Sequence, residues 1–556
     1  MDDKISPVSR FWLLIKPDRK EIRNIYIYAF FNGLVNLSLP IGVQAIINLI
    51  QGGSMSTAWM VLVVFVISGI ILSGILQINQ LKITENLQQK IFTRAAFEFA
   101  YRMPRIKLEA LYKHYAPELM NRFFDVVSVQ KGLSKILIDF STASIQTVFG
   151  LLLLSLYHPF FIVYGLILVV LVYVIFKLTS KKGLETSLTE SENKYNVAHW
   201  LQEIARTSVS FKSAGHTELP MEQVNNHANL YIKSRDSHFK ILKYQYILMV
   251  IFKVLVAAGL LIVGSVLVME QQMNIGQFVA AEIIILLVMG SVEKLILSLE
   301  TIYDVLASLE KIGQVTDLEM EKEEGIVLTR DLLDSGLSVE FKNVSFTYPE
   351  QNKNIFNNVS FKIKSGEQIM IMGDSDSGKS TLLYLMVGLY NVNRGNVIIN
   401  GLPIRNYNPH RLRSIVGECL MDDLLFEGSL LENITMGRPN ATFENVLWAI
   451  DKLELNEFVK SLPKGLDTEL HPQGKQFSKG IVDKLILARS IADKPKLLLI
   501  KDAMSSLIEE ERERIMSFLT DKSNGWTLVI ATRDKEMKSK VDRVFLSKNG
   551  SLKEII

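Results

Sequence analysis

Long apolar stretches dominate the first part of the chain. Six segments before residue 312 each carry about 20 mostly apolar residues, the length that an α-helix needs to cross a lipid bilayer. Only Tyr157, His158 and Pro159 separate two of them, and a tight turn is expected there because proline cannot continue a helix. Buried helices of a soluble bundle are the alternative, but they rarely run this far without a polar stripe. The pattern therefore predicts six membrane spans, at residues 25–50, 59–78, 137–156, 160–176, 246–268 and 275–297.

Lysine and arginine gather at one side of these spans. The short turns at residues 51–56, 157–159 and 269–274 contain neither residue, whereas the opposite ends are rich in both. Loops that carry Lys and Arg stay on the cytosolic side of a membrane. We therefore expect both termini to lie in the cytosol. The two long polar loops, residues 79–135 and 177–243, are expected there as helical extensions of the spans.

Charged side chains also occur inside the predicted spans, and two of them lie far from the cytosolic ends. Lys253 and Glu282 are costly in lipid, so both are expected to face the interior of the bundle or a water-filled cavity. At about 1.5 Å per helical residue, Lys253 lies roughly 12 Å deeper than Glu282, which disfavours a salt bridge between them. Two interpretations stay open: contacts between helices or with a partner chain, and the polar lining of a substrate path.

An ordinary globular mixture follows the apolar part. Apolar residues make up 48% of the 556 residues, which excludes a disordered chain. A single cysteine, Cys419, excludes a disulfide framework and a Cys-based metal site. The net charge of +3 gives no reason to expect a nucleic acid as partner. We predict a membrane domain at residues 1–312, an acidic linker at 313–336 and a second domain at 337–556.

A phosphate-binding loop carries the chemistry of the second domain. An apolar strand at residues 368–372 runs into the pattern G-x-x-x-x-G-K-[ST], and a helix follows. Consecutive backbone amides of such a loop form an anion-binding nest, and the helix adds the positive end of its dipole. Lys379 is expected on the β- and γ-phosphates of ATP, and Ser380 on Mg²⁺. The residues expected to bind ATP are Gly373, Asp374, Ser375, Asp376, Ser377, Gly378, Lys379, Ser380 and Thr381.

Six spans followed by such a domain resemble a half-transporter of the ATP-binding cassette (ABC) exporter family over essentially the whole chain. The resemblance implies a membrane all-α bundle of six transmembrane helices followed by a cytosolic α/β P-loop ATP-binding cassette domain. Tyr348 matches the tyrosine that stacks on adenine in this family, and an ordinary strand tyrosine is the alternative. Ser478, Lys479 and Gly480 stand where the family has its Leu-Ser-Gly-Gly-Gln signature.

In the signature, Lys479 replaces a glycine and Ile481 the glutamine, and four positions around the chain's own ATP site also depart from the family's pattern. Met421 replaces the glutamine that touches Mg²⁺, Lys501 the aspartate that ends the second nucleotide strand, Asp502 the catalytic glutamate, and Thr532 the switch histidine. Loss of a positioned general base costs roughly 10²–10⁴ in rate, and Asp502, one methylene shorter than glutamate, stays only a weak candidate for that role.

Lys501 puts a positive charge where the family has a negative one near the metal. The Coulomb energy between two unit charges about 4 Å apart is about 4 kcal/mol at an effective dielectric constant near 20. Either Lys501 repels Mg²⁺, or its ammonium takes over part of the metal's charge. Both readings predict that the chain binds ATP, holds Mg²⁺ more weakly than its family does, and hydrolyses ATP very slowly.

The resemblance also implies a partner. In this family two nucleotide domains sandwich two ATP molecules, so Ser478, Lys479 and Gly480 would face the ATP of a second half-transporter. The leading hypothesis is the hydrolysis-impaired half of a heterodimer that couples ATP binding to substrate export. The alternative is a non-transporting, ATP-sensing membrane regulator or receptor that forms a homodimer. A soluble P-loop kinase has no place for six spans. The bacterial inner membrane is the expected location, and accessory secretion proteins are further partners if the chain belongs to the peptide and protein secretion branch.

Overall fold

The computed structural model describes residues 5–52, 57–330, 333, 335–420, 424–502 and 504–556. The chain divides into two compact units, and each is described by itself. The first unit comprises Met1–Pro104 and His114–Leu318, and the second comprises Arg105–Lys113 and Glu319–Ile556. A short segment of the first long loop, Arg105–Lys113, thus belongs to the second unit. The domain limits predicted from the sequence assign this segment to the membrane domain.

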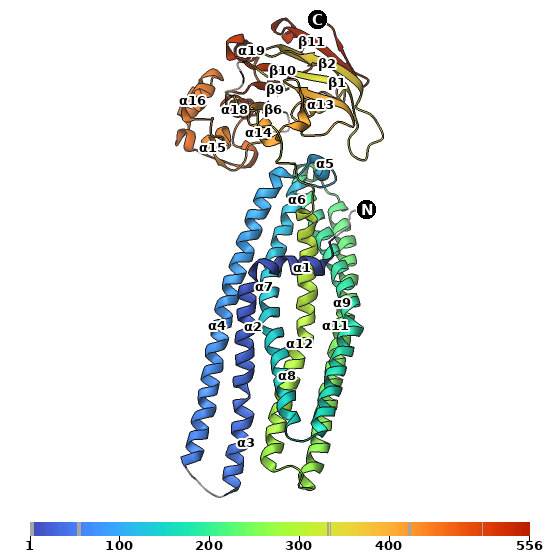
Figure 1. The fold of residues 1–556 in the computed structure, drawn as a ribbon. Helices are drawn as coiled ribbons and strands as arrows, with labels where there is room; N and C mark the ends of the chain where they lie inside the picture. The colour runs from blue at the N-terminus through green and yellow to red at the C-terminus, as the bar shows by residue number, and fades with distance from the viewer. Residues whose placement is uncertain (1–4, 53–56, 331–332, 334, 421–423, 503) are drawn as a thin grey trace. The chain divides into compact units, whose positions relative to one another are not determined.

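Long helices make up the first unit (Figure 1). Among the described residues, six helical stretches are long and apolar enough to cross a membrane, which confirms the six predicted spans. The chain is therefore a multi-pass membrane protein. The helices of this unit are α1 (Pro7–Ile15), α2 (Arg19–Asn36), α3 (Ser38–Gln51), α4 (Thr57–Arg102), α6 (Ala116–Met120), α7 (Asp125–Lys135), α8 (Ser141–Ser155), α9 (Phe160–Arg206), α10 (Ser208–Ser213), α11 (Leu219–Met269) and α12 (Ile275–Thr316).

Two of the predicted spans are interrupted. The first breaks at Leu37, between α2 and α3, because Pro40 has no N–H to donate and its ring clashes with the carbonyl four residues earlier. The third contains one π-helical turn, Ile136–Phe140, between α7 and α8. Such turns insert an extra residue into the hydrogen-bond ladder of an α-helix. The apolar pattern predicts the span in both cases but not the break.

The last helix, α12, is the one against which the others pack. The buried residues of α12 run from Gly276 to Val315. Helices α9 and α11 lie side by side along most of their length (Figure 1). Gly183 lets α9 approach α12 closely, because a Cβ there would lie 2.4 Å from the ring of Tyr303. The side-chain amide of Gln245, on α11, donates to Thr179 Oγ1 at 2.9 Å and to Tyr303 Oη at 3.0 Å. A buried polar layer therefore joins these three helices.

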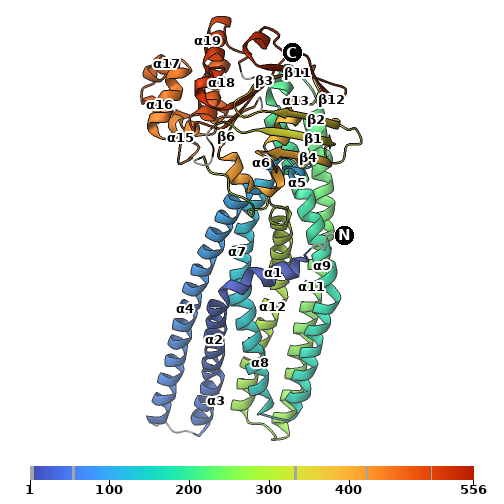
Figure 2. The ribbon, with the colours of Figure 1, turned by 45° about the horizontal axis from the view of Figure 1, so that its top comes forward.

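The long helices continue well beyond the apolar stretches. Helices α4, α9 and α11 run through most of the two polar loops, and the chain turns back between α9 and α11 through the short helix α10. Helix α1 lies across the long helices (Figure 2). The helical extensions expected from the sequence are therefore present.

Two sheets form the centre of the second unit. The six-stranded sheet has the order β12-β11-β3-β10-β9-β6, parallel except for β12, and an antiparallel sheet has the order β2-β1-β4-β5. The strands are β1 (Val339–Phe346), β2 (Phe356–Ile363), β3 (Gln368–Met372), β4 (Arg394–Ile399), β5 (Leu402–Pro403), β6 (Val416–Cys419), β7 (Gly428–Ser429), β8 (Glu469–Leu470), β9 (Leu497–Lys501), β10 (Thr527–Ala531), β11 (Arg543–Lys548) and β12 (Ser551–Glu554). The helices are α5 (Leu108–Leu111), α13 (Lys379–Met386), α14 (Pro409–Arg413), α15 (Leu430–Thr435), α16 (Phe443–Lys452), α17 (Asn456–Ser461), α18 (Lys479–Ile491) and α19 (Glu509–Leu519).

The central strands of the six-stranded sheet bring the predicted site together. β3 and β10 are neighbours and are buried at every position, as expected of parallel strands that are covered on both faces. Loops that follow the carboxyl ends of parallel strands meet at one edge of the sheet, where α/β proteins bind ligands. The predicted phosphate loop follows β3 at this edge. The fold class predicted from the sequence, a six-helix membrane bundle followed by an α/β domain, is confirmed.

Candidate functional site

The loop between β3 and α13 wraps tightly on itself. A Cβ on Gly373 would lie 2.5 Å from both Ser377 Oγ and the carbonyl oxygen of Ser547. Gly378 caps α13 with a φ of 91°, and a Cβ there would lie 2.8 Å from the ring of Phe356. Both positions therefore require glycine, as the phosphate-loop pattern predicts.

Lys379 is folded back over this loop. Its ammonium donates to the carbonyl oxygens of Gly373, at 2.6 Å, and Asp374, at 2.7 Å. Burial lowers the pKa of the Lys379 ammonium below its ordinary value, and the nearby carboxylate of Asp502 opposes that shift. Lys379 therefore lies at the centre of the loop, where a phosphate group can take the place of the carbonyl oxygens.

A cavity of about 630 Å³ opens beside the loop. Four of its lining side chains are cationic (Lys353, Lys379, Lys501 and Arg533), and two are acidic (Asp376 and Asp502). A surplus of positive charge in a concave site favours a polyanionic ligand. The remaining lining residues are Tyr348, Gln351, Ile355, Ser375, Ser377, Gly378, Ser380 and Thr381.

Tyr348 lines this cavity, and two further tyrosine rings pack against it. The Tyr348 hydroxyl shares a hydrogen bond of 2.8 Å with Thr381 Oγ1, which fixes its ring beside the phosphate loop. Tyr390 meets that ring edge-on, with centroids 5.2 Å apart, and Tyr112 stacks on it at 5.7 Å with an angle of 15° between the planes. Gln351 holds Tyr112 in place by donating to its hydroxyl at 2.7 Å. Tyr348 is thus the aromatic ring that this cavity offers to a planar base.

The strand ends bring Lys501, Asp502 and Thr532 to the same edge of the sheet. Lys501 ends β9, and the N–H of Asp502 donates to the carbonyl of Ala531 at 3.1 Å. The N–H of Thr532 donates to the carbonyl of Ile371, also at 3.1 Å. Thr532 lines a neighbouring cavity of about 420 Å³, which shares Asp502 and Arg533 with the first. Met421, the fourth predicted departure, lies outside the described residues.

Family models match both parts of the chain. The model described as the ABC transporter transmembrane region matches residues 22–292, and the model described as ABC transporter matches residues 356–505, which include the phosphate loop. This chain belongs to the ABC transporter family.

Relatives and one solved structure agree with this assignment. This ABC transporter is 34% identical over 249 residues to the ABC transporter ATP-binding protein YfiB of Bacillus subtilis. The matched stretch covers 45% of this chain and 42% of YfiB. It is 30% identical over 299 residues to HlyB, the alpha-hemolysin translocation ATP-binding protein of Escherichia coli O157:H7, which covers 53% of this chain and 42% of HlyB. The matched stretches thus span about half the length of these relatives. A bacterial Atm1-family ABC exporter solved with ATP bound shares the fold, with a TM-score of 0.85 and 18% identity over 96% of this chain and 94% of that chain.

The segment that stands at the family's signature lies apart from the phosphate loop in this ABC transporter. Ser478 precedes the first turn of α18, and its hydroxyl makes no cap hydrogen bond. Lys479 is turned back along α18 by an ion pair of 2.8 Å with Asp483 Oδ1, while Ser506 donates to the other oxygen of that carboxylate. Ser478, Lys479 and Gly480 do not line the cavity beside the phosphate loop.

The ABC transporter family implies ATP and Mg²⁺ as ligands. The residues beside the phosphate loop fit ATP. The loop and the cationic side chains suit the phosphates, and the ring of Tyr348 suits the base. These residues fit a divalent cation less well. Magnesium prefers oxygen ligands, yet the ammonium of Lys501 stands beside Asp502 and Ser380 at the edge of the sheet. Among the described residues, no group of three or more His, Cys, Asp or Glu side chains is arranged to hold a metal.

Several residues of the site could not be found from the sequence. Arg533 directly follows Thr532, donates to Ser375 Oγ and reaches the phosphate loop only because β10 pairs with β3. Lys353 and Gln351 come from the turn between β1 and β2, a few residues after Tyr348, and no motif marks these two positions. Tyr112 comes from the segment Arg105–Lys113, far from the second unit in sequence.

Lys253 pairs with Glu293, a charged residue of the last span that the sequence analysis did not consider. Lys253 does not pair with Glu282, in agreement with the expectation from their depths. Its ammonium lies 2.6 Å from Glu293 Oε2, which joins α11 to α12. Both side chains are about one-third exposed within the unit, at 34% and 33%.

Proposed function

We propose that this chain is the ATP-binding, hydrolysis-impaired half of an ABC exporter and couples ATP binding to substrate export together with a second half-transporter. One observation carries the proposal. Lys501 and Asp502 end the second nucleotide strand on the cavity that Lys379 and Arg533 also line. A cation therefore stands at the edge where this family places a metal-binding carboxylate.

The lining residues explain how ATP is held without turnover. Lys379, Lys501 and Arg533 offer positive charge to the phosphates, and such charge counts for more in a cavity than in bulk water. The ring of Tyr348 lines the same cavity and supports the expected contact with adenine. Asp502 is shorter than the glutamate that this position carries in the family, and the hydroxyl of Thr532 is no general base near neutral pH. Binding is thus favoured and proton removal from water is not.

The second half-transporter supplies what this chain lacks. In such a pair Ser478 and Gly480 face the partner's ATP, and the partner carries an intact glutamate and histidine. The basic flanks of the spans support a cytosolic position for both termini and for the nucleotide-binding unit, in a bacterial inner membrane. HlyB is named for alpha-hemolysin translocation, which supports a place in the peptide and protein secretion branch, with accessory secretion proteins as further partners.

A binding experiment with and without metal tests the proposal. The full chain in lipid nanodiscs is labelled with a photoreactive ATP analogue, either with Mg²⁺ or with EDTA. We expect equal labelling in both conditions, loss of labelling in Lys379→Ala, and Mg²⁺-dependent labelling in Lys501→Asp. Lys548→Ala, an exposed lysine at the end of β11, is the matched control and keeps the wild-type behaviour. Wild-type labelling that disappears in EDTA contradicts the proposal.

The partner is tested by mass spectrometry of the tagged chain purified from its native membrane in mild detergent. We expect a stoichiometric second half-transporter with complete catalytic motifs. A chain that pairs only with itself and does not hydrolyse ATP supports the alternative, a non-transporting membrane regulator or receptor.

A further inference from the structure

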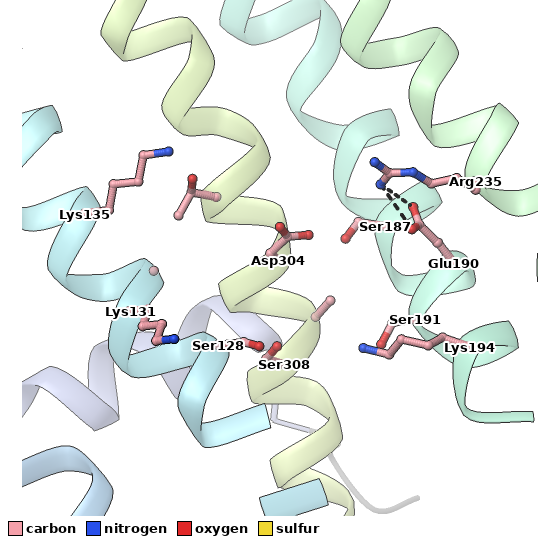
Figure 3. A pocket seen from close by; sticks show the side chains of 13 residues that line it. Ser128, Lys131, Lys135, Ser187, Glu190, Ser191, Lys194, Arg235, Asp304 and Ser308 are labelled. Carbon is pink, nitrogen blue, oxygen red and sulfur yellow. Dashed lines mark hydrogen bonds and ion pairs between the residues drawn. The ribbon is translucent and has the colours of Figure 1, made fainter. Parts of the chain in front are cut away.

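A second polar cavity lies within the first unit. Its volume is about 470 Å³, within the usual range of small-molecule sites, and its walls come from α7, α9, α11 and α12 (Figure 3). The lining residues come from the polar extensions of these helices and not from their apolar stretches. Gly132 belongs to the lining and brings α7 close to α12, because a Cβ there would lie 2.3 Å from Val305 Cγ2.

The lining carries more positive than negative charge. Four cationic side chains face two carboxylates, Glu190 and Asp304. Arg235 pairs with Glu190 at 3.1 Å, so these two charges offset one another (Figure 3). Lys131 and Lys135, one turn apart on α7, make no ion pair or hydrogen bond with any described residue. Lys194 lies 4.0 Å from Asp125 Oδ1, so after both ion pairs are set aside Lys131 and Lys135 remain against the single carboxylate of Asp304.

Three serine hydroxyls in the lining, on residues that are otherwise mostly buried, lack hydrogen-bond partners. Ser187, Ser191 and Ser308 are 4%, 9% and 7% exposed, and their hydroxyls bond to no atom in the part of the chain that the structure describes. Other hydroxyls on the same helices, such as Thr179 and Ser298, donate to the carbonyl four residues earlier. These hydroxyls open onto the cavity, where they are placed to donate to a ligand that enters it.

The geometry in Figure 3 shows where such a ligand would lie. Lys131 and Lys194 reach from opposite sides toward the space in front of α12, which Ser308 and Asp304 border. Lysine ammonium groups and serine hydroxyls are all donors toward oxyanions. We propose that this cavity binds a small anionic molecule through its carboxylate or phosphate oxygens.

Calorimetry on the full chain in phosphatidylcholine nanodiscs tests this site without any nucleotide. Citrate probes carboxylate binding. Pyrophosphate probes phosphate binding and is titrated into the Lys379→Ala chain, so that the nucleotide cavity does not compete. We expect saturable binding of at least one anion, and the tighter of the two identifies the preferred oxyanion.

Lys131→Ala/Lys194→Ala should weaken that binding at least about tenfold, because charge-assisted hydrogen bonds are the strong ones. The charge-matched control is Lys181→Ala/Lys233→Ala, two exposed lysines on α9 and α11 outside the cavity, and it should stay within about twofold of wild type.

A second variant separates recognition from folding and from overall charge. Ser191→Ala/Ser308→Ala leaves the net charge unchanged and should weaken binding by about tenfold with the thermal unfolding midpoint preserved. The proposal is overturned if neither anion binds saturably, or if the control lysines matter as much as Lys131 and Lys194. Because no nucleotide takes part, either negative result leaves the proposed ATP site untouched.

Discussion

Single side chains at the ends of β9 and β10 set the chemistry of the nucleotide cavity. Lys501 and Asp502 border the cavity beside the phosphate loop, and Thr532 lies next to it in the neighbouring cavity. The backbone around them is that of an ordinary P-loop sheet, with β3, β10 and β9 in register. Activity is therefore expected to depend on these side chains and not on the fold.

Restoring the family residues should restore turnover. We predict that Lys501→Asp/Asp502→Glu/Thr532→His raises the ATP hydrolysis rate of the nanodisc-reconstituted chain by about 10²-fold or more, because it returns a positioned base. Phosphate release from purified protein measures this rate. Lys501→Asp alone is the control and should bind Mg²⁺ without a comparable gain. A triple variant that binds ATP and Mg²⁺ but stays as slow as wild type would show that the impairment has another cause.

We expect Asp376 to weaken phosphate binding for two reasons. It adopts a φ of 60°, a left-handed conformation that costs non-glycine residues about 1–2 kcal/mol, and its carboxylate lines a cavity built for phosphates. We predict that Asp376→Gly tightens ATP binding by about tenfold or more, measured by titration with a fluorescent ATP analogue. Asp374→Asn removes an exposed charge that does not line the cavity, and its effect should be much smaller.

At the scale of helices and strands, continuous apolar runs were sufficient to predict the six spans and the central strand. The spans are long apolar runs, and the central strand Gln368–Met372 is an apolar run that leads into a glycine-rich loop, so both follow from local sequence. The break at Leu37 and the π-turn before α8 depend on single hydrogen bonds, which hydropathy does not report. Arg533 reaches the phosphate loop through the pairing of β10 with β3, and Tyr112 reaches Tyr348 from a distant segment of the chain. Neither contact is encoded in a local sequence pattern.

The pair between Lys253 and Glu293 should hold α11 against α12. Removing one partner leaves a charge inside the spans without its counter-ion, which costs about 2.5–3.5 kcal/mol on insertion scales. We predict that Lys253→Leu and Glu293→Leu each lower the unfolding midpoint in detergent by several degrees, and that the double variant recovers most of the loss. Additive losses in this cycle would mean that the two side chains do not act as a pair.

On the scale of the whole molecule, the second unit depends on a piece of distant chain. Within that unit Asn391 donates from its backbone N–H to Glu109 Oε1 at 2.8 Å, and Tyr112 covers the ring of Tyr348. A fragment of residues 319–556 lacks both contacts. We predict that a synthetic peptide of residues 104–114 raises the unfolding midpoint of this fragment by a few degrees, measured by scanning fluorimetry. A scrambled peptide is the control, and equal effects of both peptides would refute specific docking.

The chain order of this unit also bears on how the protein is made. During synthesis, Arg105–Lys113 leaves the ribosome while its partners around Tyr348 and Asn391 are still untranslated. The segment therefore has no docking site until the last spans have entered the membrane and the sheets have formed. Docking of this segment is therefore a late step in folding. A substitution at Glu109 or Tyr112 should slow the folding of the ATP-binding unit. Quality-control proteases would meet an unfinished nucleotide domain rather than a misfolded membrane bundle.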